Sequence, residues 1–134
     1  MSENETKQNQ STPVIPADPK EAAKLLVQLR QAKKFSGLLG IAKKAGKVVA
    51  GTNLVTDAIR KGSPKTLPAA VFLAADASEN TKKRVRNCCT YYEIPLHITA
   101  LTTEALGQAI GKTGNVSAVG VTDRGLCDAL CNLL

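Results

Sequence analysis

A glycine corner with lysines close by in the sequence is the feature best suited to chemistry. The short β-branched run at 47–50 is bounded by Gly46 and Gly51 and predicts a strand, and from Thr52 onward the apolar spacing predicts a helix. Unpaired backbone N–H groups at such a helix start favour an anion. Three lysines precede the corner: Lys43, Lys44 and Lys47. The pattern is typical of a phosphate-facing corner.

Plain helix capping is the alternative, because Thr52 or Asn53 could serve as the N-cap residue. Local chemistry leaves both readings open, since a lone glycine corner is a weak signal. The helix is expected to end at Gly62, behind Arg60 and Lys61. Its expected buried face consists of Leu54, Val55, Ala58 and Ile59.

Catalytic and metal-binding patterns are missing from the sequence. The single histidine, His97, has no acid or nucleophile near it in sequence, and there is no P-loop or paired-carboxylate motif. The four cysteines are Cys88, Cys89, Cys127 and Cys131. They could form a four-thiolate zinc site, but no Cys-x-x-Cys knuckle is present, so buried, reduced helical thiols are expected. We therefore predict no metal, no cofactor and no enzymatic activity.

The charge of the chain is unevenly distributed. The formal net charge is +7, and residues 1–18 contain one lysine and three acidic residues, so the rest of the chain carries +9. This excess suggests an anionic partner, most commonly nucleic acid, with an acidic protein or an anionic membrane as alternatives. No apolar run approaches the roughly 20 residues that cross a bilayer, and the N-terminus lacks the features of a secretory signal. We expect a cytoplasmic protein.

Helices and strands alternate along the chain, which predicts an α/β sandwich with about four strands, at least some of them parallel. Residues 1–18 are expected to form a disordered tail, and Asp18 and Pro19 to open an additional helix that either continues into the next helix or docks as an appendage. The expected helices are 20–32, 35–45, 52–61, 79–92, 104–110 and a last one capped by Thr122 or Asp123. The expected strands are 47–50, 69–75, 95–99 and 116–121.

Two side-chain expectations accompany these elements. The strand at 69–75 is apolar without alternation and should be buried on both faces. The helix at 79–92 should bury Val85, one of its cysteines and Tyr92. Its exposed cations are read either as a solvated face or as RNA contacts: Lys82, Lys83, Arg84 and Arg86.

The order of several motifs resembles the bacterial ribosomal L7Ae/L30e-like proteins over about residues 33–131. The motifs that carry the resemblance are Gly37–Gly51, Ala74–Lys83, Glu104–Gly111 and Ala118–Asp123. The resemblance implies a three-layer α/β/α sandwich with a four-stranded mixed sheet over residues 33–134. It also implies binding to structured RNA, typically a kink-turn with tandem sheared G·A pairs.

The resemblance assigns roles to individual residues. Gly51 would allow close backbone approach, Asn53 would read a purine edge and Lys61 would meet a phosphate. The loop 111–115 and the turn 76–78 would close over a flipped-out nucleotide. The predicted RNA-binding residues are Lys43, Lys44, Lys47, Gly51, Thr52, Asn53, Lys61, Asp76, Ser78, Gly111, Lys112, Thr113 and Gly114.

Two positions depart from the pattern of archaeal-type kink-turn binders. Leu54 stands where that pattern has glutamate, and Asp57 stands where it has lysine. Base-edge contacts contribute about 1–3 kcal/mol of discrimination each, so these changes should reduce specificity more than general RNA affinity.

The positive charge, the glycine corner and the resemblance together predict a monomeric, non-catalytic RNA-binding protein associated with the ribosome or translation. The alternative is a protein–protein adaptor on the same fold.

Few aromatic residues are available for stacking on RNA: Phe35, Phe72, Tyr91 and Tyr92. The sequence therefore favours readout of RNA shape and backbone over stacking on single strands.

Overall fold

The computed structural model describes residues 18–134, so the predicted tail at 1–18 lies outside the described residues except for Asp18. Helix α2 runs without a break over Pro19–Lys44, and the Asp18 carboxylate accepts a hydrogen bond from the Lys20 N–H at 3.0 Å. The two helices expected at 20–32 and 35–45 are thus one helix, since no glycine or proline separates them. The described residues up to Arg30 belong to one compact unit, and Gln31–Leu134 form another.

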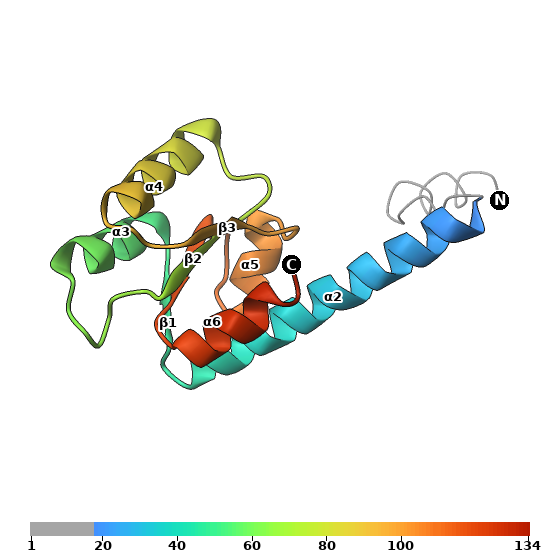
Figure 1. Ribbon diagram of the computed structural model, residues 1–134, viewed down its shortest axis with the longest axis horizontal. Coiled ribbons are helices and arrows are strands. Elements are labelled where there is room, and N and C mark those ends of the chain that lie inside the picture. The colour runs from blue at the N-terminus through green and yellow to red at the C-terminus, as the bar shows by residue number, and fades with distance from the viewer. Residues whose placement is uncertain (1–17) are drawn as a thin grey trace. The chain divides into compact units, whose positions relative to one another are not determined.

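The second unit is built on a mixed four-stranded sheet with the order β1-β4-β2-β3 (Figure 1). The central strands β4 and β2 pair antiparallel, β1 pairs antiparallel with β4, and β3 pairs parallel with β2. Every residue of β2 is buried, which confirms the expectation for this apolar strand. The strands are β1 Val48–Ala50, β2 Ala70–Leu73, β3 Leu96–Ile98 and β4 Ala118–Val121.

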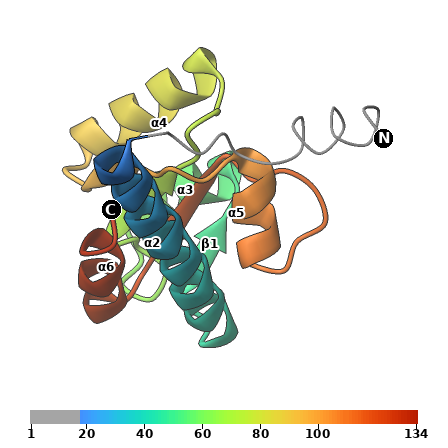
Figure 2. The same ribbon diagram turned by 90° about the vertical axis from the view of Figure 1, so that its right-hand side faces the viewer.

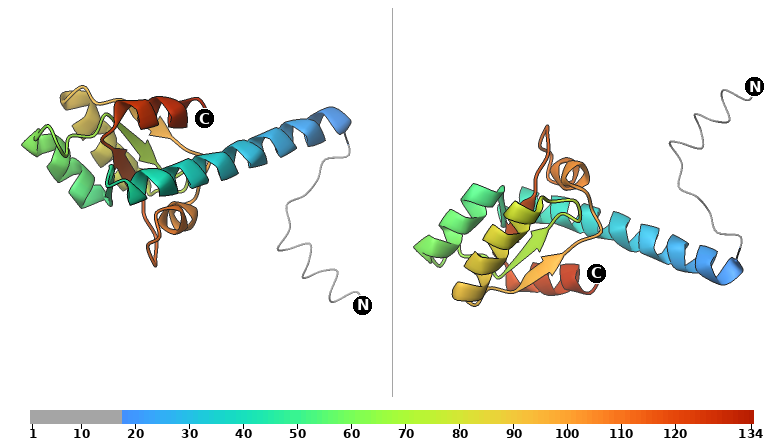
Figure 3. Two further views of the ribbon diagram at one scale, coloured as in Figure 1. Left: turned by 90° about the horizontal axis from the view of Figure 1, so that it is seen from below. Right: turned by 90° about the horizontal axis from the view of Figure 1, so that it is seen from above.

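Helices cover both faces of this sheet. On one face, α3 and α4 lie side by side and bury Val55, Ile59 and Val85 against β2 (Figure 3). On the other face, the part of α2 from Gln31 onward lies between α5 and α6 (Figure 2). Its Phe35 ring meets Phe72 of β2 edge to face. The predicted three-layer α/β/α sandwich is confirmed. These helices are α3 Thr52–Lys61, α4 Glu79–Tyr91, α5 Thr103–Ala109 and α6 Arg124–Cys131.

Side-chain caps begin three of these helices. The oxygen atoms of Ser78, Thr102 and Asp123 each accept a hydrogen bond from the N–H group three residues later. The cap of α6 agrees with the sequence-based expectation, which named Thr122 or Asp123. Among residues 18–134, no helix is long and apolar enough to cross a membrane.

The buried faces of α3 and α4 both differ from the prediction, and α4 buries both of its cysteines instead of one. The Leu54 side chain is 57% exposed, and Thr56 is fully buried instead. Thr56 tolerates this position because its hydroxyl donates to the Thr52 and Asn53 carbonyl oxygens at 3.0 and 3.1 Å. Tyr92 lies one residue beyond the end of α4 and is 41% exposed, so it does not join the core.

Close packing at Gly107 in α5 permits no side chain. A Cβ atom there would collide with the backbone carbonyl of Gly114. Gly107 also accepts a hydrogen bond from the Lys112 N–H at 2.8 Å, so it holds both ends of the exposed loop 111–114.

We expect Gly107→Ala to destabilise the protein by about 1–3 kcal/mol, because backbone atoms must move to admit the methyl group. Urea unfolding monitored by circular dichroism measures this change. Gly37→Ala is the matched control, since Gly37 lies within α2 with no atom close enough to clash. It should stabilise the protein by about 0.5–1 kcal/mol through helix propensity. Equal stability of the Gly107→Ala variant and the wild type would contradict this account of the loop.

Candidate nucleic-acid interface

The corner between β1 and α3 is formed by Gly51, whose backbone has φ 101° and ψ 143°. A positive φ of this size favours glycine, because it needs no Cβ. Gly51 donates its N–H to the Ala118 carbonyl at 2.9 Å, and its own carbonyl accepts from Val55 N–H at 2.9 Å. The corner is thereby fixed to β4.

Side-chain capping, the alternative reading of this corner, is wrong. Gly51 itself is the N-cap of α3, and no side chain makes a cap hydrogen bond there. Neither Thr52 nor Asn53 caps the helix. The first turn therefore presents backbone N–H groups that no side chain satisfies, at the positive end of the helix dipole. These N–H groups can donate hydrogen bonds to a phosphate oxygen.

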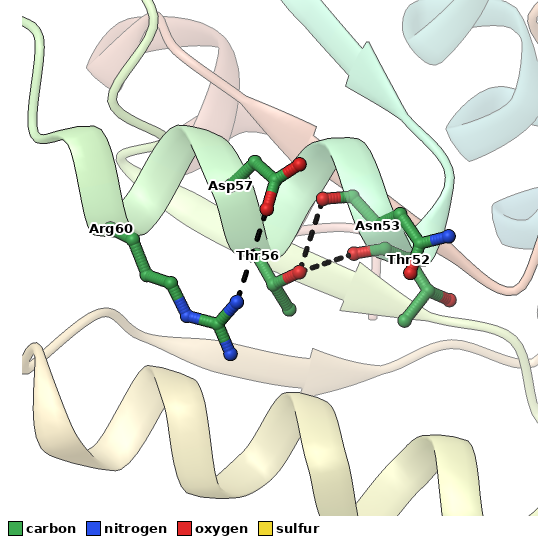
Figure 4. Close-up of polar contacts among 5 residues, drawn as sticks. All are labelled: Thr52, Asn53, Thr56, Asp57 and Arg60. Atoms are coloured by element: carbon green, nitrogen blue, oxygen red, sulfur yellow. Dashed lines mark hydrogen bonds and ion pairs between the residues drawn. The ribbon is translucent and has the colours of Figure 1, made fainter.

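Asn53 is exposed on the first turn of α3, and its side-chain amide projects from the helix without a bond to the other residues drawn in Figure 4. Thr56 occupies the inner side of the same turn through its two hydrogen bonds. An exposed amide can donate and accept at once, which suits the edge of a purine.

Two further segments meet at the same end of the sheet as Gly51. Ala74, just after β2, donates its N–H to the Ser117 carbonyl at 2.9 Å, beside the Gly51–Ala118 bond. Thr103 at the start of α5 accepts from the Val116 N–H at 3.0 Å. The structure thus brings together the corner, the turn that follows β2 and the chain that leads into β4.

The side chains of Asp76 and Ser78 in that turn have structural roles. The Asp76 carboxylate accepts from the Thr103 N–H at 2.7 Å, which ties the turn to α5. The Ser78 hydroxyl accepts from the Thr81 N–H at 3.1 Å as the cap of α4. Both residues hold the loops in place, and both are exposed.

The loop after α5 is exposed from Gly111 to Asn115. Gly111 and Gly114 have φ values of 72° and 112°, which a side chain at either position would strain. Lys112 and Thr113 lie between these two glycines. The loop therefore holds the Lys112 charge on a backbone whose conformation the glycines determine.

A groove lies over the edge strand β1, with a volume of about 360 Å³, within the range of small-molecule sites. We call it the β1–α3 groove. Lys43, Lys61 and Lys112 reach it from the end of α2, the end of α3 and the loop after α5. Lys44 and Lys47 are exposed but do not line it. The lining residues are Lys43, Val48, Val49, Ala50, Leu54, Asp57, Ala58, Lys61, Thr66 and Lys112.

The charge of the β1–α3 groove is positive, with three lysines against the single carboxylate of Asp57. Asp57 lies 3.9 Å from the Arg60 guanidinium, and both side chains are more than half exposed, so this pair contributes little (Figure 4). Thr66 and the apolar strand residues of the groove were not predicted as site residues. Only the exposure of Leu54 could have indicated a groove beside β1. That exposure depends on which side of α3 faces the sheet.

A cysteine and the single histidine meet on the far side of the sheet from α3. Cys131 Sγ lies 3.3 Å from His97 Nε2, a contact that the sequence spacing did not predict. Burial, with the nearby Asp128 carboxylate, raises the pKa of the Cys131 thiol, so the protonated form is favoured and the pair is a poor nucleophile. Within residues 18–134, no group of His, Cys, Asp or Glu side chains is placed to hold a metal ion.

The raised pKa values of two buried thiols, Cys89 and Cys127, predict that the protein loses stability at alkaline pH. Burial, assisted by Cys88, raises the pKa of Cys89 from 9.0 to about 11, and burial, assisted by Cys131, does the same for Cys127. The unfolded chain therefore loses these protons first, so stability present below pH 9 is lost as the pH rises from 9 to about 11. We expect a loss of about 2 kcal/mol per thiol over this window.

Urea unfolding between pH 8 and pH 10.5 measures this loss. A variant with Cys89→Ala and Cys127→Ala is the control, because it keeps the lysines and tyrosines that titrate in the same range. It should be less stable at pH 8 but should show a flatter pH dependence. Parallel pH profiles for the two proteins would contradict the role of the thiols.

Comparison with known proteins agrees with this fold. The Ribosomal protein L7Ae/L30e/S12e/Gadd45 family matches residues 33–130. The chain is similar to two proteins named RNA-binding protein YlxQ: 42% identity to that of Bacillus subtilis over 72% of this chain and 91% of the relative, and 42% to that of Enterococcus faecium over 69% and 82%.

Two solved structures share the fold. A protein of unknown function from Bacillus halodurans C is 33% identical with a TM-score of 0.66, covering 75% of this chain and 95% of its own. The Giardia lamblia 15.5kD RNA binding protein is 16% identical with a TM-score of 0.58, covering 78% and 84%, and supports the fold alone. The family match spans more than half of the sequence, and the curated relatives match over most of their own length. The chain therefore belongs to the Ribosomal protein L7Ae/L30e/S12e/Gadd45 family.

Proposed function

We propose that this chain binds a structured RNA with a kink-turn or a similar sharp bend, carried by ribosomal RNA or another RNA of translation, and that it does so as a monomer. The observation that carries the proposal is that the Gly51 corner, which has no side-chain cap, lies next to a groove lined by three lysines. Backbone N–H groups and lysines suit phosphates, while the exposed Asn53 amide suits a base edge. The names of the curated relatives support RNA as the partner.

The RNA would lie across one end of the sheet and along α3. Its backbone would follow the β1–α3 groove past Lys43, Lys61 and Lys112. The exposed loop 111–115 and the turn after β2 would border the nucleotide that the bend exposes. Family membership also supports the prediction that the chain is not an enzyme.

A salt-series binding assay tests this function, using a kink-turn RNA and its mutant that lacks both sheared G·A pairs. We expect the intact RNA to bind about five- to hundredfold more tightly, because one good base-edge contact contributes about 1–3 kcal/mol. Equal, salt-sensitive binding to both RNAs would overturn the kink-turn assignment and leave a different RNA shape. No binding to either RNA at modest salt would overturn RNA recognition by this surface.

A protein-binding role is the second candidate, and the exposed Leu54 together with Asp57 in the groove favours it. An exposed leucine next to a carboxylate suits a partner protein better than a phosphate backbone. Affinity purification after nuclease treatment distinguishes the two roles. Recovery of one stoichiometric protein that a Leu54→Lys variant no longer retains would favour the adaptor.

A further inference from the structure

A second hollow lies on the outer side of the sandwich, between α3 and α4, which lie side by side in Figures 1 and 3. Its volume is about 380 Å³, and it shares no residue with the β1–α3 groove. We call it the α3–α4 hollow. Its lining residues are Arg60, Arg84, Asn87, Cys88, Tyr91 and Tyr92.

The two tyrosines of the hollow contribute little to the core. Tyr91 is 79% exposed and Tyr92 is 41% exposed, while α4 is anchored by Val85, Cys88 and Cys89. The two rings meet edge to face, with their centroids 4.9 Å apart. An exposed aromatic pair of this kind leaves ring surface open for a planar ligand.

The polar groups of the hollow favour an anion. Arg60 and Arg84 bring two guanidinium groups, and no acidic residue lines the hollow. Asp57 approaches Arg60 only at 3.9 Å in an exposed pair, so the Arg60 guanidinium is still available. Asn87 adds an amide that can donate and accept. The guanidinium groups can bind a phosphate, the tyrosine rings can stack on a base, and the amide can contact the edge of that base.

We propose that the α3–α4 hollow binds one unpaired nucleotide of a single-stranded RNA segment. The base lies against Tyr91, the adjoining phosphate lies between Arg60 and Arg84, and Asn87 contacts the base edge. This assignment rests on the proposed function, because it extends RNA binding to a second surface. Two guanidinium groups without an acidic residue in the lining favour an anionic RNA strand, whose phosphate and base both find a partner there.

Helix α3 links the two surfaces. Asp57 lines the β1–α3 groove and Arg60, one turn later, lines the hollow. Asn53 and Arg60 are about 10 Å apart along the helix axis, from the rise of 1.5 Å per residue. A single strand that leaves the bent RNA at the corner can therefore follow α3 into the hollow.

Tyrosine fluorescence gives a direct test, since the chain has no tryptophan and both of its tyrosines line this hollow. We expect titration with a short oligouridylate to quench the tyrosine emission, after correction for absorbance with free N-acetyltyrosinamide. The same titration followed by anisotropy of a labelled oligouridylate measures affinity for variants. Tyr91→Ala and Arg84→Ala should each weaken binding at least fivefold, as expected for loss of one stacked base or one phosphate contact.

Matched variants separate the hollow from the general positive field. Tyr91→Phe keeps the ring and should retain affinity within twofold. Lys83→Ala and Arg86→Ala remove exposed cations of the same helix outside the hollow, and each should also change affinity less than twofold. If either control variant loses as much affinity as Arg84→Ala, or if oligouridylate binds without quenching or not at all, the proposal is overturned. Quenching by an acidic peptide but not by oligouridylate would overturn it in favour of a protein-binding site.

The groove and the hollow can fail separately in this test. A kink-turn RNA without single-stranded flanks should depend on the lysines of the groove and should not respond to Tyr91→Ala. If the wild-type protein does not bind the kink-turn RNA but its tyrosine emission is quenched by oligouridylate, the proposed function is overturned and the hollow is supported. Intact kink-turn binding without quenching by oligouridylate would overturn the hollow alone.

Discussion

Reversal of two lysine charges in the β1–α3 groove, Lys43→Glu with Lys61→Glu, should weaken binding to the kink-turn RNA by about a hundredfold near 100 mM salt. Each lysine that meets a phosphate releases about one counterion, so the slope of log affinity against log salt should fall by about two. Introduced carboxylates also repel the backbone, which adds to the loss. Filter binding or anisotropy over a salt series measures both quantities.

The control for this variant is Lys33→Glu with Lys34→Glu. These lysines carry the same charge on exposed positions of α2, but they do not line the groove. The control has the same net charge as the groove variant, so it shows the effect of the overall field alone. We expect less than a tenfold loss and a nearly unchanged salt slope. Equal losses for the two variants would remove the groove from the binding site.

The second large effect is a gain of specificity in the variant Leu54→Glu with Asp57→Lys. These changes restore the pattern from which the chain departs, on two exposed positions that line the groove. A glutamate beside Asn53 can accept from a guanine edge, and a lysine at 57 meets phosphate where a carboxylate repels it. The preference for the intact kink-turn over its G·A mutant should rise by about five- to hundredfold.

The two substitutions can be assayed singly to separate their effects. Asp57→Lys alone should raise affinity for both RNAs, because phosphate contacts carry no sequence information. Leu54→Glu alone should lower general affinity but raise the preference for the intact RNA. Because both side chains are exposed, the stability of each variant should stay within about 0.5 kcal/mol of the wild type. If the preference of the double variant stays at the wild-type value, the RNA does not bind along this face of α3.

Helix and strand positions followed from local patterns in the sequence. Gly51 and Gly62 mark the bounds of α3, and the unbroken apolar run around Phe72 identified the central strand. These signals are local, since glycine conformations and hydrophobic periodicity act within a few residues. The exact phase of α3 was harder, because Leu54 and Val55 are adjacent apolar residues and only packing against the sheet decides which one is buried.

The composition of the site required the tertiary structure. Sequence proximity suggested Lys43, Lys44 and Lys47 as one group, but the groove combines Lys43 with Lys61 and Lys112 from distant segments. Similarly, the pairing of Cys131 with His97 follows from the way α6 packs on the sheet. Spacing along the chain does not determine such contacts. Lys61 and Lys112 were predicted as RNA-binding residues only through the family resemblance, and the Cys131–His97 contact was not predicted at all.

The order of the strands in the sheet has a consequence for biosynthesis. Strand β4 lies between β1 and β2, although it is the last of the four to be made. Until it leaves the ribosome, β1 has no partner, and the Gly51 N–H lacks its acceptor at Ala118. Such distant pairings close late in folding. A nascent chain that ends before Ala118 would therefore lack a formed corner, so recognition would begin only after the segment that contains β4 has left the ribosome.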